Sequence, residues 1–542
     1  MKKFFSMVCA CLLALSAQAT DIKKYDALYE NLPFQMEKVT RPQFPANEVN
    51  LKDFGAIGDG SSLCTTAFAK AIDALTQKGG GKLIVPQGVW FTGPIVLKSN
   101  INLHLEKGAV ILFSPDDALY PFIETSFEGL DTRRCQSPIS GHHLTNVAIT
   151  GQGCIDGNGE YWRPLKKQKV TAAQWKQITS RGGAFKRADY WFPSEGALKA
   201  DNSANMNVPK TPASEEEWNE IKRFLRPVMI SLVSCKNVWL NGVIFQNSPA
   251  WNIHPLMCEN VLIEDVLVRN PSYAQNGDGL DLESCKNALI VNSTFDVGDD
   301  GICIKSVIVN STFDVGDDGI CIKSGKDADG RKRGIPCENV IVNGCTVFKG
   351  HGGFVVGSEM SGGVKNIKVS DCQFLGTDVG LRFKSTRGRG GVVENIYIDN
   401  MSMFDIQTDV ITFDLYYGGK SAVEVLNDGD EAKSQKVQKF KVDETTPCFR
   451  NIDINHVICR TARRAAYFNG LPEMPVSNIH IKDMEVNNAQ QGIVINRTDG
   501  VKLENIKVSA KTHTFDAKNS KNVTVNDKTY KKIDEKGITL DF

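Results

Sequence analysis

One pattern, an asparagine followed by alternating apolar residues, reads Asn451-Ile-Asp-Ile, Asn478-Ile-His-Ile and Asn505-Ile-Lys-Val, and each step from 451 to 478 to 505 is 27 residues. Short strands separated by turn residues, with no helical pattern between them, explain such a repeat. One unit cannot bury its apolar face alone, but stacked units share a continuous core, so the repeat predicts an all-β, right-handed parallel β-helix. The same pattern also begins at Asn146, Asn237, Asn260, Asn287, Asn339, Asn366, Asn395 and Asn522.

The composition is that of a soluble globular protein. The chain has 542 residues, of which 41% are hydrophobic and 23% charged. Its 63 Lys and Arg residues balance 63 Asp and Glu residues. A nucleic-acid binder normally carries a basic excess, so we expect no nucleic-acid partner.

The first residues have the pattern of a secretory signal peptide. Lys2 and Lys3 precede an apolar stretch over 7–15, and Ala17-Gln18-Ala19 supplies small residues at a cleavage site. We therefore interpret 1–19 as a signal peptide and expect an exported protein, periplasmic or extracellular. No later stretch is long and apolar enough for a membrane span.

The remaining chain divides into a lead-in over 20–49 and a β-helix over 50–540. A helical segment over 65–76 is expected to cap the open end of the core. Polar insertions interrupt the coils at about 158–225 and 418–446. Cysteines recur in equivalent positions of the repeat, such as Cys235, Cys258 and Cys285, which predicts a stack of buried thiols, with one or two disulfides left open.

Two acidic clusters fall in successive coils. Asn276-Gly277-Asp278 places two polar side chains on one strand face if the strand is regular, although Asn-Gly also marks turns. Asp299 and Asp300 would point in opposite directions in a regular strand, so a shared site needs a corner or bulge, which the flanking glycines permit. Adjacent coils lie about 4.8 Å apart, close enough for their carboxylates to meet.

Two cationic clusters follow downstream. His351 lies among three glycines, which leave it open to the close approach of a ligand. Arg382-Phe383-Lys384 alternates so that both cations share one face, directed outward, while Phe383 is buried. Such a pair suits the carboxylate of an acidic sugar, although a solvated strand edge would look the same.

In this order, three carboxylates, a histidine and an Arg/Lys pair on a β-helix closely resemble the polygalacturonases of glycoside hydrolase family 28. Three further stretches resemble the family, beginning at Phe54, Asn247 and Gly470. The resemblance implies inverting hydrolysis of α-linked galacturonic acid, with the first Asp of the acidic pair as the acid, and the second Asp with Asp278 as bases.

The same resemblance implies that His351 tunes the acid and that Arg382 and Lys384 hold a substrate carboxylate. Asn276 is expected to contact the substrate. The partner would be an acidic pectic polysaccharide or oligogalacturonide, without a cofactor or a metal, and the enzyme a monomer.

One departure from the family is an internal duplication. The segment 290–306 recurs without change as 308–324, an offset of 18 residues. A second acidic pair, Asp317 and Asp318, therefore competes with Asp299 and Asp300. If both copies wind as coils, Asp278 and His351 are forced one coil further apart, about 4.8 Å, and the constellation cannot close; if one copy is extruded, the site survives. We hypothesise that one of the two pairs is functional, and the sequence does not decide which.

Other functions stay open at this stage. A β-helix of this kind also serves as a non-catalytic polysaccharide binder, or as an enzyme inactivated by the duplication, and a pectate lyase shares the architecture. A lyase would need calcium and yield unsaturated products. Exo and endo action, and unsubstituted or rhamnogalacturonan substrates, are equally compatible with the insertion over 158–225.

Overall fold

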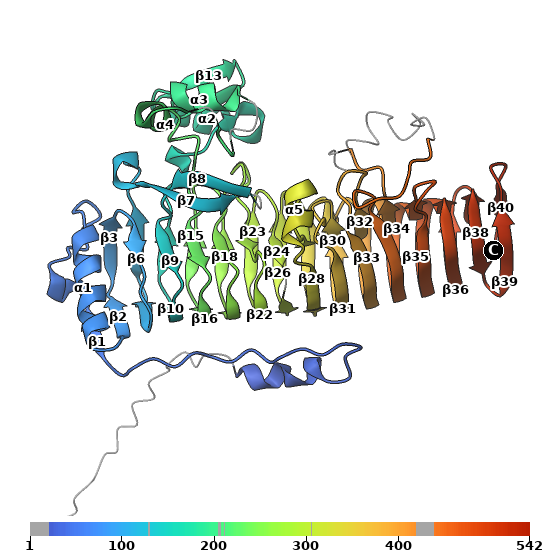
Figure 1. The fold of residues 1–542 in the computed structure, drawn as a ribbon, viewed down its shortest axis with the longest axis horizontal. Coiled ribbons are helices and arrows are strands. Elements are labelled where there is room, and N and C mark those ends of the chain that lie inside the picture. The colour runs from blue at the N-terminus through green and yellow to red at the C-terminus, as the bar shows by residue number, and fades with distance from the viewer. Residues whose placement is uncertain (1–20, 128–129, 204–206, 211, 305, 419–437) are drawn as a thin grey trace, which may run out of the picture.

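The computed structural model describes residues 21–127, 130–203, 207–210, 212–304, 306–418 and 438–542. The signal peptide predicted over 1–19, and most of the loop predicted over 418–446, lie outside these residues. Figure 1 shows a long solenoid of stacked strands running from β1 (Glu48–Asn50) to β40 (Ile538–Leu540). Among the described helices, none is both long and apolar enough to cross a bilayer.

The solenoid is the predicted right-handed parallel β-helix, in which each coil contributes short strands that pair with the coils before and after it. The strands stack in three columns. The first column contains β2 (Gly81–Val85), β5 (Ile101–Leu105), β10 (Thr145–Gly151), β16 (Lys236–Asn241), β19 (Glu259–Glu264), β22 (Lys286–Val291), β25 (Val307–Val309) and β28 (Cys337–Asn343). The second contains β3 (Gly88–Thr92), β6 (Ala109–Phe113), β11 (Cys154–Asp156), β17 (Ile244–Gln246), β20 (Leu267–Arg269), β23 (Thr294–Val297), β26 (Thr312–Val315) and β29 (Thr346–Lys349).

Most of the predicted site residues lie at or near the start of strands in the third column. It contains β4 (Ile95–Val96), β9 (Ile139–His142), β15 (Ile230–Val233), β18 (Ile253–Leu256), β21 (Leu280–Asp281), β24 (Ile302–Ile304), β27 (Asp318–Ile322), β30 (Gly352–Gly357) and β32 (Leu381–Lys384). Further along, single strands bend through more than one column: β31 (Val364–Leu375), β33 (Val392–Asp414), β34 (Cys448–Asn469), β35 (Val476–Asn496) and β36 (Thr498–Ala510).

Both ends of the stack are covered. The helix α1 (Thr65–Gln77) packs Phe68, Ile72 and Leu75 onto the first coils, which agrees with the expected cap over 65–76. At the other end, β37 (Phe515–Lys518) and β38 (Ser520–Val525) pair antiparallel with β40 and β39 (Lys528–Ile533). Antiparallel hairpins thus close the last coil edge, which would otherwise offer unpaired backbone groups.

The recurring asparagines have a physical explanation. All eleven asparagines quoted from the repeat adopt a left-handed backbone, with φ between 49° and 60°. Asparagine tolerates this conformation better than most residues. Their side chains also bond across coils: the amide of Asn237 donates to Asn146 (2.8 Å), and that of Asn260 donates to Asn237 (2.9 Å). The pattern therefore reports a turn and a hydrogen-bonded ladder together.

Several segments decorate the solenoid. The predicted insertion contains α2 (Ala172–Thr179), α3 (Glu195–Asp201), α4 (Glu215–Glu220) and the small sheet of β12 (Leu165–Lys166), β13 (Ala184–Arg187) and β14 (Tyr190–Phe192). With the hairpin of β7 (Phe122–Phe127) and β8 (Leu130–Cys135), it stands above the third column in Figure 1. The helix α5 (Asp327–Arg333) lies further along the same side.

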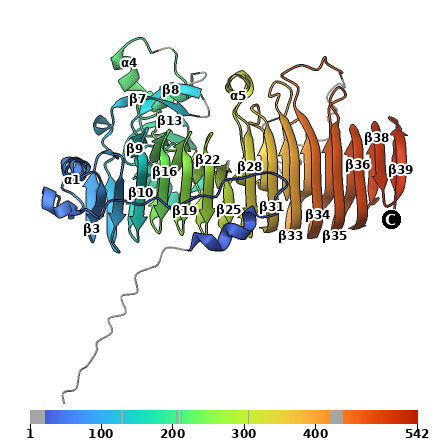
Figure 2. The same cartoon turned by 60° about the horizontal axis from the view of Figure 1, so that its bottom comes forward.

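The lead-in runs along another face of the solenoid (Figure 2). It begins with the 3-10 helix η1 (Ile22–Tyr29), and its apolar side chains pack on outward-facing residues of the first column, including Leu262 and Val291. Arg41 anchors the end of this segment through a 2.7 Å ion pair with the buried Glu264. The lead-in thus covers an apolar stripe that the coils leave on their outer surface.

Both copies of the repeated segment are wound into the helix. Thr294 pairs with Thr312, and Ile302 with Ile320, so the strands of the first copy lie beside the same strands of the second, in register. Neither copy is extruded. The first copy ends at Ser306 and β25 begins at Val307, so no asparagine of the repeat pattern opens this short strand.

Candidate active site

The site lies at the corner where the chain passes from the second column of strands into the third. A cavity of about 290 Å³ opens there. Side chains that carry charge or hydrogen-bonding groups form much of its lining, and they come from several successive coils: Asn276, Asp278, Asp281, Glu283, Asp299, Asp300, Asp317, Lys323, Lys326 and Arg333. The predicted cluster of carboxylates is therefore brought together, and it contains members of both copies.

The strand register places the carboxylates in two rows. Leu280 pairs with Ile302 and Ile302 with Ile320, so the residues two positions earlier, Asp278, Asp300 and Asp318, occupy one position in three successive coils. The second row holds Asp299, Asp317 and His351, each one residue earlier in the chain, because Asp318 pairs with Gly352. The expected corner thus exists, and it directs adjacent acidic residues into neighbouring rows.

Glycines behind the carboxylates allow the coils to stack this closely. A Cβ on Gly301 would lie 2.6 Å from the carbonyl oxygen of Gly319, and a Cβ on Gly319 would lie 2.5 Å from Val347. Neither separation is tolerated between real atoms. Any other residue at these two positions would push the coils apart and separate the acids that they carry.

Burial and mutual repulsion raise the pKa of most of these acids. Burial, with Asp300 nearby, raises the pKa of Asp299 to about 6. Burial followed by Asp300 and Asp318 raises the pKa of Asp317 to about 7. Burial also raises the pKa of Asp278 well above its usual range, and its Oδ1 has no hydrogen-bond partner among the described residues. Each of these carboxyl groups is therefore disposed to hold a proton near neutral pH.

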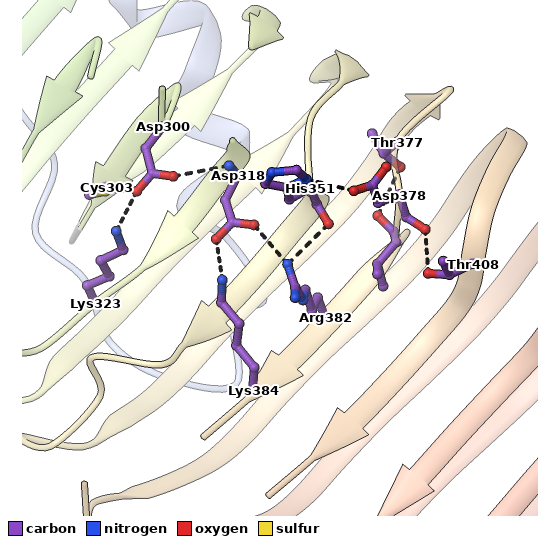
Figure 3. A network of polar contacts seen from close by, with 11 residues as sticks. Asp300, Cys303, Asp318, Lys323, His351, Thr377, Asp378, Arg382, Lys384 and Thr408 are labelled. Carbon is purple, nitrogen blue, oxygen red and sulfur yellow. Dashed lines mark hydrogen bonds and ion pairs between the residues drawn. The ribbon is translucent and has the colours of Figure 1, made fainter. Parts of the chain in front are cut away.

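Asp318 has the opposite surroundings. Its carboxylate accepts hydrogen bonds from Lys384 Nζ at 2.6 Å and from Arg382 at 3.4 Å (Figure 3). Burial alone would raise the pKa of Asp318, but Lys384 and Arg382 outweigh it and lower that pKa. Asp318 thus favours the ionised form, one residue away from Asp317, whose carboxyl group holds its proton up to about pH 7.

The cations of the predicted Arg382-Phe383-Lys384 cluster do share one face of β32, and Phe383 is buried on the other. They point away from the core, as expected, but this face is not solvated: Arg382 is 4% exposed and Lys384 7%. The ring of Tyr417 lies over both cationic side chains, and both form ion pairs with Asp318. Neither lines the cavity, so their predicted contact with a substrate carboxylate stays a prediction.

His351 lies in the coil after Asp317. Its backbone N–H donates to the Asp317 carbonyl at 2.7 Å, and its Nδ1 lies 2.6 Å from Asp378 Oδ2. The hydrogen bond with Asp378 raises the pKa of His351. His351 is separated from Asp278 by the coils of both copies, one more than a single copy would give. It therefore neighbours the acids of the second copy only.

Asn276 differs from its predicted geometry. Its backbone is left-handed, with φ of 52°, so it belongs to a turn and does not share a strand face with Asp278. The Asn-Gly turn, rather than the strand, is correct at this point. From the turn, the backbone N–H of Asn276 donates to Asp299 Oδ2 at 2.9 Å, and its side-chain oxygen accepts from the buried Arg226 at 2.8 Å.

Sequence reasoning missed several charged residues of the cavity. Asp281 follows Asp278 by three residues in the same coil, and burial raises the pKa of Asp281 to about 7. Lys323 donates to Asp300, and Arg333 donates to Glu283. Lys326 is half-buried, and its ammonium group makes no ion pair or hydrogen bond with the described residues. A signal existed in the run of charges from 323 to 333, which follows the second acidic pair.

The cysteines form the buried stacks that the repeat predicted. Cys235, Cys258 and Cys285 are buried free thiols in successive coils. Cys303 and Cys321, the duplicated pair, are also buried and unbridged. Cys303 Sγ lies 3.4 Å from Asp300 Oδ2 at the edge of the cavity.

Comparison with known proteins gives two kinds of match. A family model described as "Glycosyl hydrolases family 28" matches residues 214–310 and, separately, 307–429. The two matches meet inside the repeated segment. Among solved structures, a hyperthermoactive exopolygalacturonase from Thermotoga maritima is 30% identical, with a TM-score of 0.64, over 96% of this chain and 98% of that chain.

Curated sequences agree with that structure. A "Probable polygalacturonase" from Vitis vinifera is 28% identical over 81% of this chain and 74% of its own length. An "Exo-poly-alpha-D-galacturonosidase" from Dickeya chrysanthemi is 28% identical over 68% of this chain and 57% of its own length.

Proposed function

Because the chain belongs to glycosyl hydrolases family 28, we propose that it hydrolyses the α-linkage between galacturonic acid residues of pectic polysaccharides. It is a glycoside hydrolase of polygalacturonase type. One observation carries the assignment of the site: a cavity lined by stacked carboxylates, among them Asp317, whose pKa is raised and which directly precedes Asp318, whose pKa is lowered. Pairs of acids whose pKa values are driven apart divide into an acid and a base.

The reaction needs only these two roles and water. The protonated carboxyl group gives its proton to the glycosidic oxygen as the bond between that oxygen and C1 breaks. An ionised carboxylate removes a proton from water, whose oxygen forms the new bond to C1 on the opposite face. The sugar leaves with inverted configuration, and the two carboxyl groups exchange protonation states until solvent restores them.

An acidic substrate also needs cations in the cavity. Lys326 supports this part of the proposal, because it lines the cavity and its ammonium group is not neutralised by any described side chain. The substrate is therefore an anionic pectic chain or an oligogalacturonide.

We further propose that cleavage occurs at a chain end. Trp251 lines the cavity and stacks on Phe127 of the β7–β8 hairpin, with ring centroids 4.3 Å apart. From the insertion, Tyr190 donates to Gln275, next to Asn276 of the cavity, at 3.2 Å. These contacts support a wall at one end of the cavity, which favours exo action over cleavage within a long chain.

The test is the release of reducing ends from polygalacturonate, measured beside product absorbance. Hydrolysis yields saturated products, whereas a lyase would give unsaturated, absorbing products, and a binding protein would give none. If neither the full chain nor a variant with one copy removed released reducing ends, the proposed hydrolase function would be refuted.

Two further proposals have their own tests. N-terminal sequencing of the secreted protein, expected to begin at Thr20, tests our proposal that 1–19 directs export. Sedimentation tests the proposed monomer.

A further inference from the structure

We infer that the repeated segment moves the acid–base set by one coil, so that Asp300, Asp317 and Asp318 form it. Asp300 then stands where Asp278 would stand in a helix with a single copy. This inference rests on the proposed hydrolase function. Asp300 would thus act as a base from the position of Asp278, and not as the second member of an acidic pair.

The register gives the first argument. The backbone N–H of Gly279 donates to the Asp300 carbonyl at 3.0 Å, and that of Gly301 donates to the Asp318 carbonyl at 2.9 Å. The relation of Asp278 to Asp300 is therefore repeated, one coil later, in the relation of Asp300 to Asp318. Two overlapping sets of three carboxylates result, and they share Asp300.

Only the second set, Asp300, Asp317 and Asp318, is followed in the next coils by the predicted histidine and cations. In the row of Asp317, the next coil supplies His351, and Asp318 receives Lys384 and Arg382. In the row of Asp299, the next coil supplies Asp317, another acid. The first set therefore faces a carboxyl group where the second faces an imidazole.

Asp299 and Asp317, the first acids of the two pairs, also differ in their surroundings. Asp299 accepts backbone N–H groups on both oxygens, from Asn276 at 2.9 Å and from Asp300 at 3.3 Å. No such bond holds the carboxyl group of Asp317 among the described residues, so this group is the one available to a glycosidic oxygen. Asp317 also lines the cavity.

The second copy also builds the environment of Asp300. Lys323 donates to Asp300 Oδ2, and the backbone N–H of Asp318 donates to Asp300 Oδ1 at 3.1 Å. Both donors belong to the second copy. Asp278 has no comparable cation: its Oδ1 is buried and unpartnered within the described residues. Asp300, and not Asp278, is thus the carboxylate below the second pair that has a cationic partner.

The two matches of the family model meet at the boundary between the two copies. One match ends at residue 310, after the first copy, and the other begins at residue 307, before the second. The second match runs from the second acidic pair through His351, Arg382 and Lys384. The pattern after the acidic pair is therefore continuous only from the second copy.

The experiment compares four asparagine substitutions, made one at a time in the full chain, by kcat on polygalacturonate. We expect Asp317→Asn and Asp318→Asn to lower kcat at least 100-fold, which is the usual cost of losing general acid–base catalysis. We expect Asp278→Asn and Asp299→Asn to lower kcat less than tenfold. Thermal unfolding of each variant separates a lost role from lost folding.

A second background makes the test specific. Deleting residues 290–307 leaves one copy, whose coil then lies between the coil of Asp278 and the coil of His351. In this background Asp278→Asn should lower kcat at least 100-fold, because Asp278 then takes the position of Asp300. The same substitution thus changes from tolerated to severe with the number of copies.

Three outcomes overturn the inference while the hydrolase function stands. The first is a loss of at least 100-fold for Asp278→Asn or Asp299→Asn in the full chain. The second is a loss of less than tenfold for Asp317→Asn. The third is an inactive full chain with an active deletion variant, which would mean that the duplication destroys the site. Inactivity of both backgrounds would instead refute the proposed function.

Discussion

Replacing Lys384 by methionine tests the electrostatic core of the site. Lys384 Nζ lies 2.6 Å from Asp318 Oδ2, and the two side chains are 8% and 3% exposed. Removing one partner of a buried ion pair leaves an uncompensated charge and costs about 3–5 kcal/mol of unfolding free energy. Arg382, at 3.4 Å from Asp318, retains part of the compensation, so we expect the lower end, about 3 kcal/mol, at neutral pH.

The pH dependence of this loss follows from the sign of the pKa shift. The folded protein holds the pKa of Asp318 below its usual range, so the ion pair stabilises the fold above the unfolded pKa of about 4, and the stabilisation is lost below it. The Lys384→Met variant should therefore differ most from the parent at neutral pH. The difference should narrow as the pH falls from about 4 through the lowered pKa of folded Asp318, below which Asp318 is protonated in both proteins.

Urea unfolding followed by fluorescence, at pH 7 and at pH 4 and below, measures the effect. A matched double variant, Asp318→Asn with Lys384→Met, removes both charges and should be more stable than Lys384→Met alone. Equal stability of the parent and Lys384→Met at pH 7 would refute this reasoning, as would a double variant that shows the full sum of both single losses.

Three further predictions concern activity. Since burial and neighbouring acids raise the pKa of Asp317 to about 7, kcat/KM should fall tenfold per pH unit above pH 7; a profile flat to pH 9 would contradict an acid at this position. Lys326→Gln should raise KM for polygalacturonate about tenfold and leave KM for the methyl-esterified polymer unchanged, whereas Lys332→Gln, on the exposed side of α5, should change neither. Trp251→Ala should shift products from monomers or dimers toward longer oligomers, measured by chromatography of digests; an unchanged product pattern would count against a wall at this end.

The fold was predictable because its signal is local and repeated many times. An asparagine such as Asn237 marks both a left-handed turn and a ladder bond to the neighbouring coil, so each copy of the pattern reports the same geometry. The cluster of carboxylates followed, since a β-helix brings equivalent positions of successive coils together. The burial of Arg382 and Lys384 did not follow. Alternation gives the face that two residues share, but whether this face meets solvent or Asp318 depends on contacts between distant coils.

The position of the acid–base set depends on a property that no single motif contains. Each acidic pair carries the same residues, so their chemistry is decided by the neighbouring coils: an imidazole beside Asp317, a carboxyl group beside Asp299. In a solenoid, an inserted coil displaces everything after it by one step and leaves everything before it in place. A duplication inside the site therefore breaks the set only if no residue of the new coil can replace the partner left behind. Here the inserted coil carries its own carboxylate in the row of Asp278, because the duplicated segment contains Asp300 or its copy Asp318. The repeat thus supplies the replacement for the contact that it interrupts, which is why an extra coil in a β-helix is compatible with a complete set of carboxylates.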